Sequence, residues 1–483
     1  MKHMLRLGSK YSHLVHDAGC RCFSPELQKA SLRLEALSRR GFLSGLGAAA
    51  VVGSLAGPSF AQTAAGPSKT LFRELRLFDG KSGDVKSGAQ VLVENGRITG
   101  VDMTNAPAPA DAVVVSCRNG VLMPGLIDAH WHAIFAAVPI NVLLNGDPGI
   151  IFASSTAEAE RTLSRGFTTI RDLGGPSFSF KQAIDTGLIP GPRIYPSGAM
   201  ITTSGGHADL RLPSEIPRDG GKLSKGELLG GAAIVDGIAD LKMRIREQLL
   251  QGASQIKLVG GGGVSSPRSP LDIVTFSEEE LRAGVEVAQD WNTYVTVHAY
   301  TSRAIRRALA AGVQSIEHAH LMDDETAAMF AEKGAWLSTQ PFLSMEDTGP
   351  LTGPSADRAQ QLFAGTPKIY GFVRKHGIKT AWGSDVLFSP AIGPRQNVIL
   401  THLANWYKNA EVLQMATSGN AELLSLSNLR NPYPGKLGVI EEGALADLLV
   451  VDGNPLDDIR LMEDPHKNFV VIMKDGRPHK NVL

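Results

Sequence analysis

Six polar residues stand at or just after the ends of apolar runs that are spread over more than half of the chain. They are His130, His132, Lys257, His298, His318 and Asp385. His298, for example, closes the run Tyr294-Val-Thr-Val-His298, and Asp385 closes Thr380-Ala-Trp-Gly-Ser-Asp385. Metal-binding side chains at successive strand ends are what a barrel with its active site at the C-terminal mouth requires. The six residues therefore predict an α/β fold, a (β/α)8 barrel, with one binuclear metal centre at its mouth.

The central part of the chain alternates strand and helix patterns, as such a barrel demands. The expected strands are Leu126 to His130, Thr168 to Asp172, Arg193 to Ser197, Gln255 to Val259, Val295 to His298, Ser315 to His318, Trp336 to Gln340 and Lys379 to Ser384. A helix is predicted over Glu278 to Asp290, because Ser277 and Glu280 form a capping box ahead of an apolar stripe. A second helix is expected to follow Ser302 and to end at Gly312.

Both flanks of this segment are rich in short strands. Residues 69–120 include Gln90-Val-Leu-Val-Glu94 before the turn signal Asn95-Gly96, and the far end carries Ala446 to Asp452 and Phe469 to Met473. We expect the two flanks to form one small β-sandwich. The predicted domains are a β-sandwich part over 62–123, the barrel over 124–428 and the second β-sandwich part over 429–483.

The chain opens with a segment that is typical of a twin-arginine export signal. Arg39-Arg40 precedes a run of small and apolar residues that ends at Ala61. Residues 1–61 are therefore predicted to be removed, and the protein is predicted to be periplasmic or secreted. Removal takes Cys20 and Cys22 away and leaves Cys117, so no intramolecular disulfide is available. The remaining chain holds 40 basic and 45 acidic residues, a formal charge of −5. This mild acidity gives no reason to expect nucleic acid or, after cleavage, a membrane as a partner.

The string around the first two histidines is the most specific motif in the chain. His130 and His132 are two residues apart, so both rings project to the same face of an extended strand and can bind one ion. The full string, Pro124-Gly-Leu-Ile-Asp-Ala-His-Trp-His132, resembles the motif that opens the barrel in the amidohydrolase superfamily. The resemblance extends from about Thr70 to the C-terminus and includes Gly443-Ala-Leu-Ala-Asp-Leu-Leu-Val-Val-Asp-Gly-Asn-Pro455.

The resemblance implies a role for each of the six residues. It makes His130, His132 and Asp385 ligands of one metal ion and His298 and His318 ligands of a second. Lys257 matches the lysine that is carboxylated in binuclear members and bridges both ions. A free ammonium cannot bind a cation, but two nearby metal charges favour the neutral amine, which can take up CO2. The alternatives, a core lysine in an ion pair and core histidines with satisfied hydrogen bonds, remain open from the residues alone.

Four further residues are candidates for supporting roles. His207 matches the histidine after the third strand in the prolidase-like branch, where it would contact the substrate and help to stabilise the oxyanion. Arg268 is a candidate for binding a substrate carboxylate. Asp172 is expected to orient metal ligands, and His320 to lie in the same outer shell or a loop. The glycine run 260–263 is not a phosphate loop, because no Gly-Lys-Ser/Thr follows it.

The expected function is metal-dependent hydrolysis of an amide or peptide C–N bond. Two ions, predicted to be zinc from the nitrogen-rich ligands, would lower the pKa of a bridging water to give hydroxide, with Asp385 as base and then acid. The resemblance implies dipeptides or N-acyl amino acids as small-molecule substrates. Three alternatives stay open: a cyclic amide or imidazolone hydrolase or deaminase, which generally lacks the lysine; a phosphotriesterase-like hydrolase; and a non-catalytic binding protein. The sequence leaves a homo-oligomer open.

Overall fold

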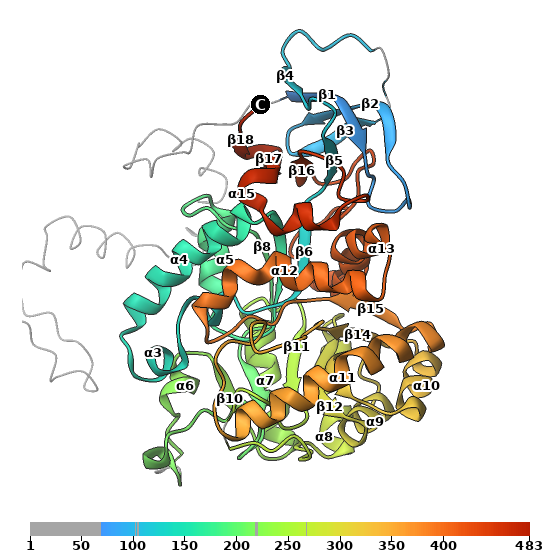
Figure 1. Ribbon diagram of the computed structural model, residues 1–483. Coiled ribbons are helices and arrows are strands. Elements are labelled where there is room, and N and C mark those ends of the chain that lie inside the picture. The colour runs from blue at the N-terminus through green and yellow to red at the C-terminus, as the bar shows by residue number, and fades with distance from the viewer. Residues whose placement is uncertain (1–68, 102, 104–105, 218–220, 267) are drawn as a thin grey trace, which may run out of the picture. The chain divides into compact units, whose positions relative to one another are not determined.

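A computed structural model describes residues 69–101, 103, 106–217, 221–266 and 268–483 (Figure 1). The predicted export segment, 1–61, with Cys20 and Cys22, lies outside these residues. Within the described part of the chain, no helix is both long enough and apolar enough to cross a membrane.

Strands from both ends of the chain form one small β domain. They are β1 (Lys69–Leu77), β2 (Lys86–Glu94), β3 (Arg97–Val101), β4 (Val113–Ser116), β5 (Val121–Pro124), β16 (Leu448–Val451), β17 (Phe469–Lys474) and β18 (Arg477–Asn481). The blue and red strands in Figure 1 lie together because β16 pairs with β5, in the order β18-β17-β16-β5-β1-β2-β3. The Asn95-Gly96 and Asp475-Gly476 turns have positive φ at both residues, which hairpin turns of this kind require. The expectation of a small domain built from both flanks is confirmed.

Strand β1 lies between β2 on one side and the strands β4 and β5 on the other. Along one edge it pairs with β2, and along the other it pairs in parallel with β4 at Thr70–Arg73 and with β5 at Arg76–Leu77. The strands enclose an apolar core of their own, which includes Phe72, Val91 and Val450. The free thiol of Cys117 also lies in this core, where burial raises its pKa to about 12. We therefore expect this thiol to be unreactive.

Parallel strands of the central segment form the barrel. They are β6 (Leu126–Trp131), β7 (Phe167–Asp172), β8 (Arg193–Pro196), β11 (Ile256–Val259), β12 (Val295–Thr301), β13 (Ser315–Leu321), β14 (Trp336–Thr339) and β15 (Lys379–Trp382). Each lies within a few residues of its predicted range. Two short strands, β9 (Met200–Thr202) and β10 (Ala232–Ile234), are additional, and β9 continues the path of β8 towards the mouth.

Two sets of hydrogen bonds close the barrel where the strand ladders are interrupted. Between β8 and β11, the amide of Ser254 donates to the carbonyl of Pro196 at 2.8 Å, and Ile201 in β9 pairs with Leu258. Between β15 and β6, the amide of Asp385 donates to the carbonyl of His130 at 2.7 Å. The second closure also places a predicted metal ligand directly beside another one.

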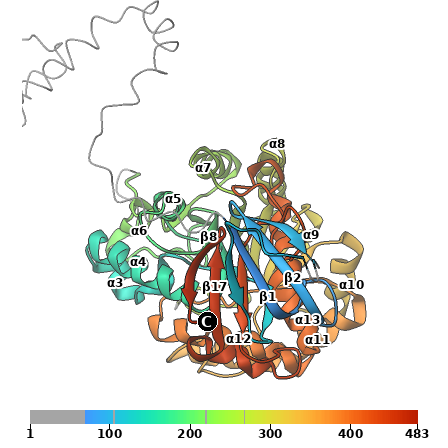
Figure 2. The same cartoon turned by 90° about the horizontal axis from the view of Figure 1, so that it is seen from above.

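Most of the helices lie around the outside of the strands, as Figure 2 shows from the side of the small β domain. They are α3 (Ile140–Asn145), α4 (Pro148–Ser164), α5 (Phe178–Asp185), α6 (Lys225–Leu228), α7 (Ile238–Leu250), α8 (Glu278–Asp290), α9 (Ser302–Ala310), α10 (Asp324–Lys333), α11 (Pro354–His376), α12 (Gln396–Thr401), α13 (Asn409–Gln414) and α14 (Asn420–Leu424). The short helix α15 (Pro465–Asn468) lies between β16 and β17 of the β domain. The predicted capping box of α8 is confirmed, since Ser277 Oγ accepts from the Glu280 amide at 3.2 Å. The expectation that Ser302 precedes its helix is wrong by one residue. Ser302 lies in the first turn of α9, where its hydroxyl accepts from the amide of Asp323.

The β domain contacts the N-terminal end of the barrel. Arg193, at the start of β8, donates to both carboxylate oxygens of Asp447 at 2.7 and 3.2 Å and also pairs with Asp475. The C-terminal ends of the strands, which carry the predicted site residues, lie at the opposite end. The small domain therefore supports the barrel without covering its mouth.

Candidate metal centre and substrate chamber

The six residues predicted to bind metal line one chamber at the C-terminal ends of the barrel strands. His130 lies in β6 and His132 directly after it, Lys257 in β11, His298 in β12, His318 in β13, and Asp385 after β15. Five of these side chains are buried and that of Asp385 is partly buried, and the chamber has a volume of about 270 Å³. His207 also lines it. Tertiary structure thus brings together residues that are up to 255 positions apart, from His130 to Asp385.

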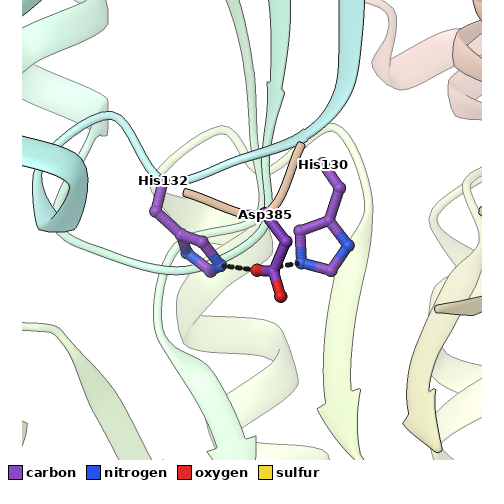
Figure 3. Close-up of side chains that lie close together, drawn as sticks. All are labelled: His130, His132 and Asp385. Atoms are coloured by element: carbon purple, nitrogen blue, oxygen red, sulfur yellow. Dashed lines mark hydrogen bonds and ion pairs between the residues drawn. The ribbon is translucent and has the colours of Figure 1, made fainter. Parts of the chain in front are cut away.

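His130, His132 and Asp385 form the tightest group (Figure 3). Nε2 of His130 lies 3.1 Å and Nε2 of His132 3.2 Å from the same oxygen, Oδ1 of Asp385. Asp128 fixes this arrangement, because it accepts from the amides of His130 at 2.9 Å and Ser384 at 3.1 Å. Two imidazoles and a carboxylate that converge on one point are a suitable donor set for a divalent ion.

In each of the four histidines predicted to bind metal, one ring nitrogen donates a hydrogen bond to a protein acceptor. His130 Nδ1 donates to Glu317 at 2.8 Å, and His132 Nδ1 to the Gly174 carbonyl at 3.2 Å. His298 Nε2 donates to the Gly262 carbonyl, and His318 Nδ1 to Gln340 Oε1, both at 2.8 Å. Metal-binding histidines are oriented in this way, with the second nitrogen left for the ion. The residues present therefore fit a metal centre.

Aromatic contacts assemble the second group of imidazoles. The rings of His298 and His318 meet edge to face at 4.5 Å, and His207 stacks on His298 at 4.6 Å. Burial lowers the pKa of His298 and His318 well below the usual value. Their neutral form, which is the one that binds a metal ion, is therefore favoured.

Lys257 is buried and lies near enough to both groups for its charge to act on His130 and His298. Among the described residues it has no hydrogen-bond or ion-pair partner within 4 Å, although Glu317 and Asp385 are near enough to act on its charge. Burial lowers the pKa of its ammonium group to about 8. Near neutral pH, the fraction of uncharged amine is therefore far larger for this lysine than for a lysine on the surface.

The residues predicted for supporting roles lie in different places. Asp172 accepts from the amide of Ala133 at 2.8 Å and the hydroxyl of Ser177 at 2.6 Å, so it holds the chain just after His132 rather than an imidazole. His320 donates to the carbonyl of Gln340 at 2.9 Å and does not line the chamber. The structure does not bring Arg268 into the chamber either; it is exposed, and Nη1 donates to the Arg211 carbonyl at 2.6 Å.

The glycine run 260–263 after Lys257 makes room for His207 and binds His298. A Cβ at Gly263 would lie 2.3 Å from the ring of His207, so only glycine lets the chain pass here. Gly262 contributes the carbonyl that holds His298. Arg358 fixes the loop through three bonds to carbonyls, including that of Gly263 at 2.8 Å.

Three residues of the site have no role in the predictions made from the sequence. Glu317 and Arg171 form a fully buried ion pair of 2.7 Å inside the barrel, beneath His130. Tyr300, two residues after His298, stacks on His318 at 4.7 Å and lines the chamber. A signal for Tyr300 exists in the sequence, because residues two apart on a strand share a face. The partner of Glu317 comes from a strand far away in the sequence, so no local signal identifies it.

Comparison with known proteins places this geometry in a family. The model of the amidohydrolase family matches residues 121–482. The chain belongs to the amidohydrolase family. It is thus a hydrolase that acts on C–N bonds, on the barrel fold of that family, whose members are typically metal-dependent.

Individual relatives cover most of both chains. An ochratoxinase from Aspergillus niger is 30% identical over 376 residues, which are 75% of this chain and 76% of the relative. A prolidase solved with N-methylphosphonate-L-proline is 32% identical, with a TM-score of 0.78 over 86% of this chain and 100% of the other. A Xaa-Pro dipeptidase with methionine in its active site is 28% identical, with a TM-score of 0.72 and the same coverage of 86% and 100%.

Proposed function

We propose that the chain hydrolyses the amide or peptide bond of dipeptides or N-acyl amino acids at a centre of two divalent ions. The position of Asp385 carries this proposal. Oδ1 lies 3.1 and 3.2 Å from Nε2 of His130 and His132, and Oδ2 lies 3.8 Å from the ring of His318, at the Nδ1 atom that Gln340 binds. One carboxylate thus lies between two groups of imidazoles. The similarity to a prolidase and a Xaa-Pro dipeptidase supports a dipeptide-like substrate.

The donor atoms divide into two sets. His130, His132 and Asp385 would hold the first ion, His298 and His318 the second, and a carboxylated Lys257 would bridge them. Zinc is the proposed metal, because imidazole nitrogen predominates among the ligands. When bound, such ions act as Lewis acids and make a water molecule acidic enough to attack near neutral pH.

The protein groups would handle the proton and the carbonyl oxygen. Asp385 is placed to accept the proton of the attacking water and to pass it to the departing nitrogen. Burial by itself would raise the pKa of Asp385. The neighbouring His130 and His132 outweigh this effect and hold the pKa well below its usual value. His207 lines the same chamber, and its Nδ1 is buried without a partner among the described residues. It is therefore free to donate to the oxygen on which negative charge develops.

The proposal is tested with metal-loaded protein and a panel of substrates read by mass spectrometry. The panel contains Xaa-Pro and other dipeptides, N-acyl amino acids, an imidazolone and a phosphotriester. We expect about two ions per chain and hydrolysis within the first two classes. Asp385→Asn keeps an oxygen for the metal but not the base, so turnover should fall by ~10²–10⁴-fold while metal remains. Hydrolysis of the phosphotriester alone, or one ion per chain, would contradict the proposal.

We also propose that the protein acts outside the cytoplasm, on the evidence of Arg39-Arg40 and the run ending at Ala61. Exchanging both arginines for lysine should keep an uncut precursor in the cytoplasm. N-terminal sequencing of the periplasmic protein provides the measurement. A chain that still begins near Met1 outside the cytoplasm would contradict the proposal.

A further inference from the structure

Apart from the predicted metal ligands, the chamber is lined mainly by apolar side chains. Val264, Leu351 and Leu362 lie on one side, and Leu387, Phe388 and Ile392 come from the segment after β15. Val264 and Leu362 belong to one apolar cluster with Tyr300, against which Leu351 packs. Leu387 and Phe388 pack against the main barrel core, to which Ile392 belongs. Both walls are therefore backed by packed side chains, which favours a fixed shape.

The two walls meet and are held to each other. A Cβ at Gly349 would lie 2.7 Å from Oγ of Ser389, so the segment after β14 touches the segment after β15 here. Asp347 links the same two segments, because Oδ1 accepts from Nη2 of Arg395 at 2.9 Å. Its other oxygen accepts from the amide of Leu343, also at 2.9 Å. These contacts hold the two walls to each other.

The charges that face this space are already engaged. Among the described residues that line the chamber, the charged side chains are Lys257, Asp385 and Asp347. Lys257 and Asp385 belong to the proposed metal centre, and Asp347 is paired with Arg395. The apolar part of the chamber thus has no unpaired charge for a substrate carboxylate or ammonium group. A charged group placed there would lose its hydration without compensation.

We infer that the apolar part of the chamber binds an uncharged, bulky aliphatic or aromatic group of the substrate, next to the amide bond. This inference rests on the proposed function and narrows its substrate class. Each methylene group moved from water into such a space should raise kcat/KM by about fourfold until the space is filled. A charged group at the same position should lower it.

Two matched substrate series test the inference. One keeps the amino acid and lengthens the acyl group from acetyl to butanoyl to hexanoyl. The other keeps the acetyl group and varies the amino acid from alanine to leucine to phenylalanine, with aspartate and lysine as charged members. We expect a steep rise in kcat/KM in at least one series, and, if it is the amino-acid series, a fall for aspartate and lysine. Flat behaviour in both would overturn the inference.

A pair of leucine variants locates the effect. Leu351→Ala should reduce the preference for the longest over the shortest substrate by about tenfold, since a pocket discriminates by the contacts it makes. Leu250→Ala, at an 80% exposed position in α7, is the matched control and should leave the preference unchanged. Metal content and circular dichroism confirm that both variants fold. An equal preference in Leu351→Ala and the wild type would overturn the assignment of this wall.

A binding measurement separates this inference from the proposed function. Calorimetry with the metal-loaded protein and acetamide, butanamide or hexanamide requires no hydrolysis. Affinity should rise by about fourfold per methylene group. If no member of the panel is hydrolysed but affinity rises, the proposed function fails and the apolar site stands. If substrates are hydrolysed but the affinity for the three amides does not change with chain length, the proposed function stands and the apolar site fails.

Discussion

Nδ1 of His130 lies 2.8 Å from Oε2 of Glu317, and both side chains are completely or almost completely buried. The other oxygen of Glu317 accepts from Arg171 at 2.7 Å and from Thr296. Burial opposes the charge of Glu317, but Arg171 and His130 hold its pKa well below the usual value. Four barrel strands thus contribute to one polar network, which fixes the ring of His130 with Nε2 towards Asp385.

Replacing Glu317 by glutamine tests this positioning role. Glu317→Gln keeps the shape but removes the charge, so His130 is held less firmly and Arg171 loses its counter-ion. We expect metal affinity to fall by about 10–100-fold, as measured by titration against a competing chelator. Glu286→Gln, in an exposed pair on α8, is the control and should have no effect. Unchanged metal affinity in Glu317→Gln would show that the pair serves stability alone.

A substitution of Lys257 tests the proposed bridge. Lys257→Ala should lose most bound metal together with activity, because the anionic bridge between the ions disappears. Acetate in excess should restore part of both by occupying the space that the side chain leaves. Metal analysis with and without acetate is the measurement, and Lys375→Ala, on the surface of α11, is the control. Wild-type metal content and turnover in Lys257→Ala would refute the two-ion centre.

Tyr300 is expected to contact the substrate. Burial raises the pKa of its phenol well above the usual value, so the hydroxyl stays protonated, and it has no hydrogen-bond partner among the described residues. Tyr300→Phe preserves the stacking on His318 and should leave metal content unchanged. Loss of one donor to the developing oxyanion should lower kcat by roughly 10²-fold in steady-state kinetics. Tyr370→Phe, another buried hydroxyl without a described partner, should leave kcat as it is. Equal kcat for Tyr300→Phe and the wild type would exclude a role in catalysis.

The contact between the two domains should be important for stability. Arg193 and Asp447 form a buried bidentate pair. Asp447→Ala leaves the arginine buried without that partner, so we expect the free energy of unfolding to fall by about 3–5 kcal/mol in urea titrations. Asp458→Ala breaks an exposed pair with Arg460 and should change little. Metal content should be normal in both variants, because the pair lies at the end of the barrel opposite the chamber. Equal stability of the two variants would mean that the pair contributes no more than a surface contact.

Much of the fold and the candidate metal site could be predicted from the chain itself. The period of two in strands and the capping box at Ser277 depend on residues close in sequence, and α8 has the predicted bounds. The Asn95-Gly96 turn is likewise a local property, because these residues tolerate positive φ. The position of His298 at the end of an apolar run was enough to predict that it lies at the mouth of the barrel, because parallel strands end on the same side of a barrel.

Only the tertiary structure decided which side chains face one another across the barrel. Glu317 reaches His130 and Arg171 because the register between β13, β6 and β7 places them at one depth, and no local pattern encodes that register. For the same reason, local patterns could not show that Arg268 lies at the surface or that Asp347 pairs with Arg395, which ends the 3-10 helix Pro390–Arg395. Short-range preferences are determined by neighbours along the chain. Burial and pairing depend on packing of the complete barrel, which brings together residues that share no sequence signal.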